Sequence, residues 1–295
     1  MYVFELEFRW PKGTKKDRYE ISPFRHAVRG ITVADAVKET IGILLVAWEI
    51  NGQVLGQTLM TKIPGGYRVL VRAPARDALS EPHHSEMARK ALSHVTSKPL
   101  GKMKMRRIGR EPDSHRECPG HPKAELILYA DVYSVESPFR CGKCFGPVPL
   151  YTLPRTEYDD QQDITYWQSA YRACDALEGK RRGPATDTFA QDQLENPESE
   201  LSQRGLKICD RVGGATGRRT WYYLTRARGL SPEAERERRC PRCGGEWLLP
   251  KRWHHRFDFR CERCGFLSRL SEPYERFDDN ADPNAPRPDP NDPGF

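Results

Sequence analysis

Six of the nine cysteines in this 295-residue chain form three C-x-x-C pairs, and this spacing limits the possible folds more than any other feature. A further cysteine precedes the first pair. The amino terminus carries acids where a secretory signal would carry lysine or arginine, so we expect a cytoplasmic protein with reduced thiols. In such a compartment, C-x-x-C spacing indicates metal ligands rather than disulfides. The cysteines concerned are Cys118, Cys141, Cys144, Cys240, Cys243, Cys261 and Cys264.

The two carboxy-terminal pairs have the spacing of a structural zinc site. Between Cys243 and Cys261 lie 17 residues, within the interval of about 15–20 that separates the two halves of such sites. Two residues between paired cysteines allow a tight turn that points both sulfurs at one ion, and a glycine follows each pair. With strands over 246–249 and 256–260, this pattern predicts a zinc ribbon. Its predicted ligands are Cys240, Cys243, Cys261 and Cys264, and the alternative is four cysteines without metal.

The first cysteine cluster repeats this geometry with one imidazole in place of a thiolate. Cys118-Pro-Gly-His121 is followed, after 19 residues, by Cys141-Gly-Lys-Cys144. We predict a second zinc site with the ligands Cys118, His121, Cys141 and Cys144. His115 is an alternative fourth ligand, and thiols that hold no metal are a further alternative. Because each site has four strong ligands and no open position, we expect two structural Zn²⁺ ions and no catalytic metal.

Hydrophobic periodicity predicts an α+β chain in four parts. Strands over 2–10, 53–60, 67–72 and 102–109 and helices following Thr32 and around Met87 give the order β-α-β-β-α-β, which indicates a ferredoxin-like fold. Residues 184–199 are polar and are predicted to be a loop. The four parts are a ferredoxin-like βαββαβ module over 1–112, a central α+β module with the first zinc site over 113–230, the zinc ribbon over 231–275, and a disordered, acidic, proline-rich tail over 276–295.

Composition and motifs exclude several classes of protein. The longest apolar stretch, residues 41–50, contains Glu49 and is much shorter than the roughly 20 residues that a membrane helix needs. The chain contains no G-x-S-x-G, H-E-x-x-H or P-loop pattern. We therefore expect no membrane segment, no enzymatic activity and no small-molecule substrate.

A basic and aromatic segment lies between the two halves of the predicted ribbon. Residues 226–270 contain twelve lysines and arginines against six acids. Cations neutralise phosphates, and exposed aromatic rings stack on unpaired bases. The predicted nucleic-acid contacts, at the tip of a hairpin, are Lys251, Arg252, Trp253, His254 and Arg256. Trp247, Phe257 and Phe259 are instead expected to form the small core of the ribbon. A second basic run covers residues 98–116 and is predicted to flank the first zinc site. A strand with one solvated face explains this run equally well, without any function.

Longer sequence runs resemble a bacterial protein family. Ser137–Tyr151, Ile164–Asp175 and Cys240–Leu249 are similar to signatures of an uncharacterised family described as Zn-ribbon-containing and as candidate nucleic-acid-binding proteins. The resemblance covers residues 118–270 well and implies a bacterial, cytoplasmic protein. Two hypotheses follow: nucleic-acid binding through the ribbon, or a protein–protein interaction module, such as an adaptor or a neutraliser of a partner protein, that uses the ribbon as a rigid platform.

Overall fold

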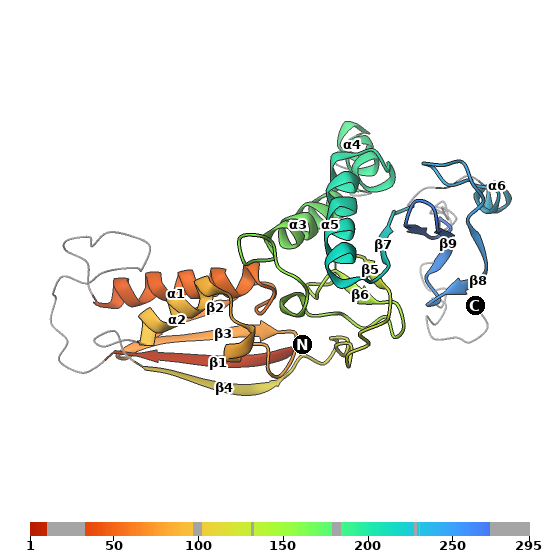
Figure 1. Ribbon diagram of the computed structural model, residues 1–295. Coiled ribbons are helices and arrows are strands. Elements are labelled where there is room, and N and C mark those ends of the chain that lie inside the picture. Colours follow the sequence, from red (N-terminus) through yellow and green to blue (C-terminus); the bar gives the residue numbers. More distant parts are fainter. Residues whose placement is uncertain are drawn as a thin grey trace.

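The computed structural model describes residues 1–10, 33–96, 102–130, 133–178, 184–226, 229 and 231–271. The tail predicted to be disordered, 276–295, lies outside these residues. Within them the chain is α+β, as predicted, and its strands form two sheets with helices packed against them (Figure 1). None of the helices in the described ranges is long and apolar enough to cross a membrane.

The first sheet contains four antiparallel strands in the order β2-β3-β1-β4. Its elements follow the predicted order along the chain: β1 (Tyr2–Arg9), α1 (Val33–Ile50), β2 (Leu59–Ile63), β3 (Gly66–Ala73), the 3-10 turn η1 (Glu81–His83), α2 (Glu86–Thr96) and β4 (Lys102–Arg110). Helices α1 and α2 cover one face of this sheet (Figure 1). Because side chains alternate along a strand, Phe4, Leu6 and Phe8 are buried under the helices, whereas Glu5 and Glu7 lie on the outer face.

The second sheet contains six strands in the order β6-β5-β7-β10-β9-β8. These strands are β5 (Leu126–Leu128), β6 (Phe139–Cys141), β7 (Thr220–Tyr223), β8 (Leu248–Trp253), β9 (Phe257–Cys261) and β10 (Phe266–Ser268). Strand β10 pairs in parallel with β7, with Phe266 opposite Tyr222 and Leu267 opposite Tyr223. Hydrogen bonding therefore continues across the boundary predicted at residue 230, and the division of the chain into four parts stays a prediction.

Helices pack on one face of the second sheet and form the larger core with it (Figure 1). The remaining elements are the 3-10 turn η2 (Leu150–Thr152), α3 (Gln162–Leu177), α4 (Pro184–Glu195), α5 (Glu200–Thr216) and α6 (Pro232–Arg236). Helix α4 lies where the polar composition predicted a loop, and that prediction is wrong. Ala190 and Leu194, four residues apart, are fully buried, so two apolar side chains on one helical face are enough to dock α4 on its neighbours.

The two halves of the chain meet at the end of α1. Gly52 has a φ of +68°, and a Cβ at this position would lie 2.5 Å from the Cβ of Leu150 in η2. Arg155 links the same two halves by hydrogen bonds. Its guanidinium donates to Asn51 Oδ1 at 3.1 Å and to the carbonyl oxygen of His83 at 2.7 Å. At position 52, both the left-handed backbone and the close approach of η2 therefore require glycine.

This junction gives a prediction with a matched control. Gly52→Ala is expected to lower the free energy of unfolding by about 1–2 kcal/mol for the left-handed backbone and by about 1–3 kcal/mol more for the clash with Leu150. Gly65→Ala is the control, because Gly65 has a φ of +69° but nothing lies within 4 Å of the added Cβ. Urea unfolding of both variants measures the difference, and equal losses would show that η2 does not press on Gly52.

Candidate metal centres

The four carboxy-terminal cysteines come together at one end of the β9–β10 hairpin. Cys240 and Cys243 precede β8, Cys261 ends β9 and Cys264 lies in the turn before β10. The sulfur atoms of this ribbon quartet all lie within 4.8 Å of one another, and those of Cys243 and Cys261 are 3.6 Å apart. In a tetrahedral site with Zn–S bonds of about 2.3 Å, sulfurs are separated by about 3.8 Å. The spacing thus suits a single tetrahedral ion.

The two turns of the ribbon quartet have the same backbone. The N–H of Gly244 donates to the carbonyl oxygen of Cys240 at 2.8 Å, and the N–H of Gly265 donates to that of Cys261 at 2.9 Å. Both glycines have a left-handed φ, +67° and +71°. A glycine after each pair therefore removes the steric cost of the turn that points two sulfurs in one direction.

The first quartet consists of Cys118, His121, Cys141 and Cys144, whose ligand atoms also lie within 4.8 Å of one another. The Nδ1 atom of His121 is 3.4 Å from the sulfurs of both Cys118 and Cys141. His115, the alternative ligand, lies outside the quartet, and its Nδ1 is instead 2.9 Å from Oε2 of Glu136. The geometry therefore favours His121 as the fourth ligand.

Phe145 occupies the position that glycine takes in the ribbon quartet. Its N–H donates to the carbonyl oxygen of Cys141 at 2.8 Å, as in the other two turns, and its φ is +57°. A left-handed backbone costs a residue with a Cβ about 1–2 kcal/mol. Packing of the Phe145 ring against neighbouring rings offsets this cost. The same contacts connect the first quartet to the β8–β9 hairpin. Ring centroids of Tyr129, His254 and Phe257 lie 5.5, 5.3 and 5.8 Å from that of Phe145.

Each quartet contains one thiol that ionises readily. Burial disfavours ionisation of Cys141, but hydrogen bonds from the backbone N–H groups of Cys144 and Lys143 outweigh it and lower its pKa to about 7. The N–H of Gly245 lowers the pKa of Cys243 to about 7 in the same way. Burial instead raises the pKa of Cys118 to about 11. Adjacent thiolates repel one another, so the cysteines of one quartet would all ionise together only around a bound cation.

The tip of the β8–β9 hairpin lies against the first quartet rather than projecting into solvent. Nε2 of His254 is 2.9 Å from the carbonyl oxygen of Gly142, which lies between Cys141 and Cys144. The guanidinium of Arg256 lies 5.1 Å from the ring centroid of Phe145. Of the five predicted nucleic-acid contacts, Trp253 and His254 are half-buried, while Lys251, Arg252 and Arg256 are exposed. The predicted core residues Trp247, Phe257 and Phe259 are buried, as expected.

Two histidines adopt an unusual backbone at this tip. His254 and His255 have φ values of +52° and +55°, and the N–H of Arg256 donates to the carbonyl oxygen of Trp253 at 3.1 Å. Two-residue turns with both φ values positive strongly prefer Asn-Gly or Gly-Gly. The contacts of His254 with Gly142 and Phe145 stabilise this turn against the cost of its left-handed backbone. These contacts join distant segments, so the local sequence does not reveal them.

Several arginines between residues 231 and 271 pack on aromatic rings. The guanidinium of Arg238 lies 4.4 Å from the ring centroid of Phe259 and 4.9 Å from that of Trp247, and burial lowers the pKa of Arg238 to about 10. Arg260 lies 4.4 Å from the ring centroid of Trp221. These cations contribute to packing, so the number of basic residues in this segment overstates the positive charge that it offers to a partner.

Comparison with known proteins places the chain in a bacterial family. Three segments match family models, each described as a domain of unknown function: DUF8589 over 25–109, DUF2310 over 121–225 and DUF8594 over 229–274. One uncharacterised Haemophilus influenzae protein is 28% identical over 229 residues, which cover 76% of this chain and 87% of the relative. Another from the same organism is 31% identical over 164 residues, 56% of this chain and 80% of the relative. The chain belongs to the family of these uncharacterised proteins. No solved structure matches it.

Proposed function

We propose that this protein is a non-catalytic zinc protein that binds nucleic acid through exposed cations of the β8–β9 hairpin. In this proposal Zn²⁺ binds both quartets, residues 231–275 form a zinc ribbon, and the first sheet with α1 and α2 forms a ferredoxin-like module. The role of the metals is structural, since each quartet supplies four protein ligands and leaves no position for a substrate.

The donor atoms support zinc over other cations. The two quartets offer seven sulfurs and one imidazole nitrogen. Calcium and magnesium prefer oxygen ligands, whereas tetrahedral sites of sulfur and nitrogen suit zinc. The imidazole in the first quartet also favours zinc over an iron–sulfur centre, in which thiolates are the usual ligands.

The exposed basic side of β8 is the observation that carries nucleic-acid binding. Lys251 and Arg252 are exposed on this strand, which is the last of the second sheet. Arg252 pairs with Asp258 at 2.8 Å, an interaction that orients its guanidinium without burying it. Trp253, in contrast, packs near Trp221 and Arg260 and offers little surface for stacking on bases. Contacts would therefore fall mainly on phosphates, and we expect weak sequence preference.

Strand β8 gives less support to the alternative function, a protein–protein interaction module. An exposed edge strand is the usual place for another chain to add a strand, and lysine or proline at the edge opposes this. Strand β8 contains both Pro250 and Lys251, and its pairing with β9 is irregular between Leu248 and Trp253. These features disfavour strand addition and leave the phosphate-binding alternative stronger.

Salt-dependent binding tests the proposal. We expect the affinity of the zinc-loaded protein for short RNA or DNA to fall steeply as salt rises. Lys251→Ala and Arg252→Ala should each reduce the slope of log affinity against log salt by about 1. Arg204→Ala is the control, because it removes the same charge from an exposed position on α5. No binding to either nucleic acid at low salt, with a protein partner retained after nuclease treatment, would favour the interaction module instead.

A further inference from the structure

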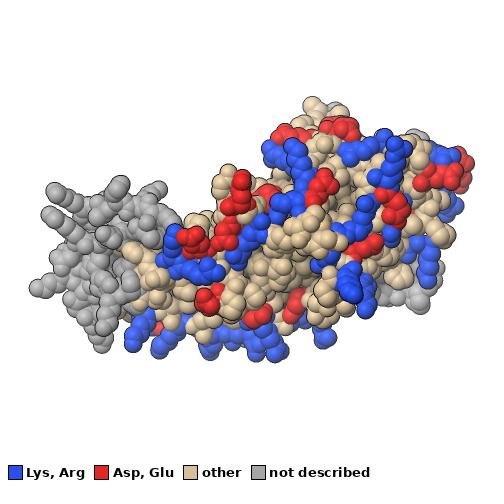
Figure 2. Space-filling view, in the orientation of Figure 1, with Lys and Arg blue, Asp and Glu red and all other residues tan. Residues whose placement is uncertain are grey.

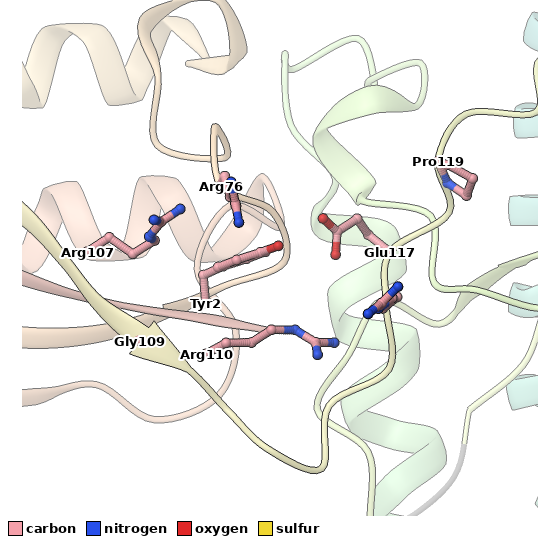
Figure 3. Close-up of a pocket in the computed structure, with 8 residues that line it drawn as sticks. Tyr2, Arg76, Arg107, Gly109, Arg110, Glu117 and Pro119 are labelled. Carbon is pink, nitrogen blue, oxygen red and sulfur yellow. The ribbon is translucent and has the colours of Figure 1, made fainter.

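A cavity of about 570 Å³ lies between the end of the first sheet and the segment that leads to the first quartet (Figure 3). It is lined by Tyr2, Arg76, Arg107, Gly109, Arg110, Arg116, Glu117 and Pro119. Four of these eight residues are arginines, and one is an acid. Figure 3 shows Arg76 and Arg107 above the ring of Tyr2, Arg110 below it, and the carboxylate of Glu117 facing the hydroxyl of Tyr2. We name it the arginine cavity.

The arginine side chains are held in place before any ligand arrives. The guanidinium groups of Arg76 and Arg107 lie 5.7 and 5.9 Å from the ring centroid of Tyr2, within the range of cation–π attraction. A guanidinium nitrogen of Arg110 donates to the carbonyl oxygen of Ser114 at 2.7 Å. Fixed side chains lose less conformational entropy on binding, so this arrangement favours a bound anion.

The cations of the arginine cavity lack the counter-charges that similar residues have elsewhere on the sheet. On the outer face, Arg68 and Arg106 pair with Glu5 at 3.3 and 3.1 Å. Among the residues that the structure describes, no carboxylate forms an ion pair with Arg76, Arg107 or Arg116. Glu117 leaves the cavity with an excess of three positive charges. Guanidinium groups collected without partners repel one another, and an anion would relieve this repulsion.

Further cations lie along β4, away from the cavity. Lysines and arginines gather along the lower edge of the molecule in Figure 2, where β4 lies. Lys102 and Lys104 of this strand are exposed. These lysines lie toward the end of β4 that is remote from Arg110, so they attract anions to this edge of the molecule but are not part of the site.

We propose that the arginine cavity binds an oligophosphate, that is, two or more linked phosphate groups. Planar guanidinium groups donate two hydrogen bonds at once to phosphate oxygens, and a hydroxyl such as that of Tyr2 adds another donor. The volume falls within the range of about 300–1,000 Å³ found for small-molecule sites, which exceeds the need of one phosphate. A ligand with three or four negative charges matches the excess charge. This inference is independent of nucleic-acid binding by β8, because the two surfaces share no residue.

Calorimetry of the zinc-loaded full chain with sodium tripolyphosphate at low salt tests this site. We expect saturable binding of one tripolyphosphate per chain. Arg76→Ala and Arg107→Ala should each weaken it roughly tenfold to a hundredfold, as expected for hydrogen bonds to a charged group. Arg107→Lys should weaken it less than Arg107→Ala, since lysine keeps the charge but loses the paired donors. The matched control is Arg106→Ala, which removes the next arginine of β4 from the outer face and should leave binding unchanged.

Competition experiments identify the source of the phosphates. Displacement of tripolyphosphate by a short RNA with a 5′-triphosphate, but not by the same RNA with a 5′-hydroxyl, assigns the site to a nucleic-acid terminus. Displacement by neither RNA assigns it to a free oligophosphate. Lys251→Ala should leave tripolyphosphate binding intact, which separates this site from β8. The inference is overturned by absence of saturable binding, by equal losses in Arg106→Ala and Arg107→Ala, or by equally tight binding of citrate.

Discussion

Cys261→Ser is expected to abolish metal binding at the ribbon quartet and to unfold β8, β9 and β10. Structural zinc contributes about 10–16 kcal/mol in small zinc domains at neutral pH, whereas an entire domain is typically stable by about 5–15 kcal/mol. Trp247, Phe259 and Phe266 are the edge of the larger core that the helices share with the second sheet, and Phe257 packs with Ile127, Trp221 and Tyr223. Without the metal, only packing at the edge of these cores holds β8, β9 and β10, because nothing else in the described part of the chain joins the two cysteine turns of the quartet. Hydrogen exchange measured by mass spectrometry should therefore show loss of protection over 240–268.

Cys174→Ser is the matched control for this substitution. Cys174 is a buried thiol of α3 that belongs to neither quartet, so its replacement should retain both metals and cost only about 1–3 kcal/mol for a buried hydroxyl. Because β10 pairs with β7, Cys261→Ser should also increase exchange in β7, while the first quartet keeps its metal. Full protection of β8–β10 in Cys261→Ser would contradict a structural role for this quartet.

Substitutions at Phe145 are expected to reverse the usual ranking of alanine and glycine. Phe145→Ala loses the ring contacts with Tyr129, His254 and Phe257, at a cost of about 2–4 kcal/mol for a half-buried phenylalanine. Phe145→Gly loses the same contacts but relieves the left-handed backbone, which recovers about 1–2 kcal/mol. Stability should therefore fall in the order wild type, Phe145→Gly, Phe145→Ala.

Urea unfolding of the zinc-loaded variants measures this order. The opposite ranking, with alanine above glycine, would show that the left-handed position after Cys144 carries no strain. A second measurement tests the contact between the hairpin tip and the first quartet. His254→Ala removes the hydrogen bond to Gly142 and should speed hydrogen exchange both in the β8–β9 turn and in the turn from Cys141 to Cys144. An effect confined to the hairpin would contradict this coupling.

Local spacing carries most of the information about the metal quartets. In a C-x-x-C turn, the two sulfurs are positioned by four consecutive residues, so the pattern is visible in the sequence without knowledge of the rest of the fold. The glycines after Cys243 and Cys264 are visible for the same reason. Period-two alternation in β1 and β3 likewise reflects one buried face of an antiparallel sheet. These features depend on neighbours along the chain, and the structure does bring the predicted ligands together in two quartets, while metal binding by them stays a prediction.

Features that depend on distant contacts could not be read from the sequence. The parallel pairing of β10 with β7 joins segments more than forty residues apart, and short strands give no sign of their partners. The docking of His254 on Gly142 spans 112 residues. The polar segment of α4 is helical because two buried side chains dock it on other helices. The arginine cavity is a further example. Its arginines come from separate segments of the chain, and only the fold brings Arg76, Arg107 and Arg116 together beside Tyr2.

The metal content of the purified protein shows whether both quartets hold an ion. The chain should be isolated under reducing conditions without chelators, and its zinc should be measured by elemental mass spectrometry against an accurate protein concentration. The two quartets predict two equivalents of zinc per chain, falling to one in Cys261→Ser and to one in Cys141→Ser. Substantially less than two equivalents in the intact, reduced protein, or no loss of zinc in either variant, would rule out two structural zinc sites in this chain.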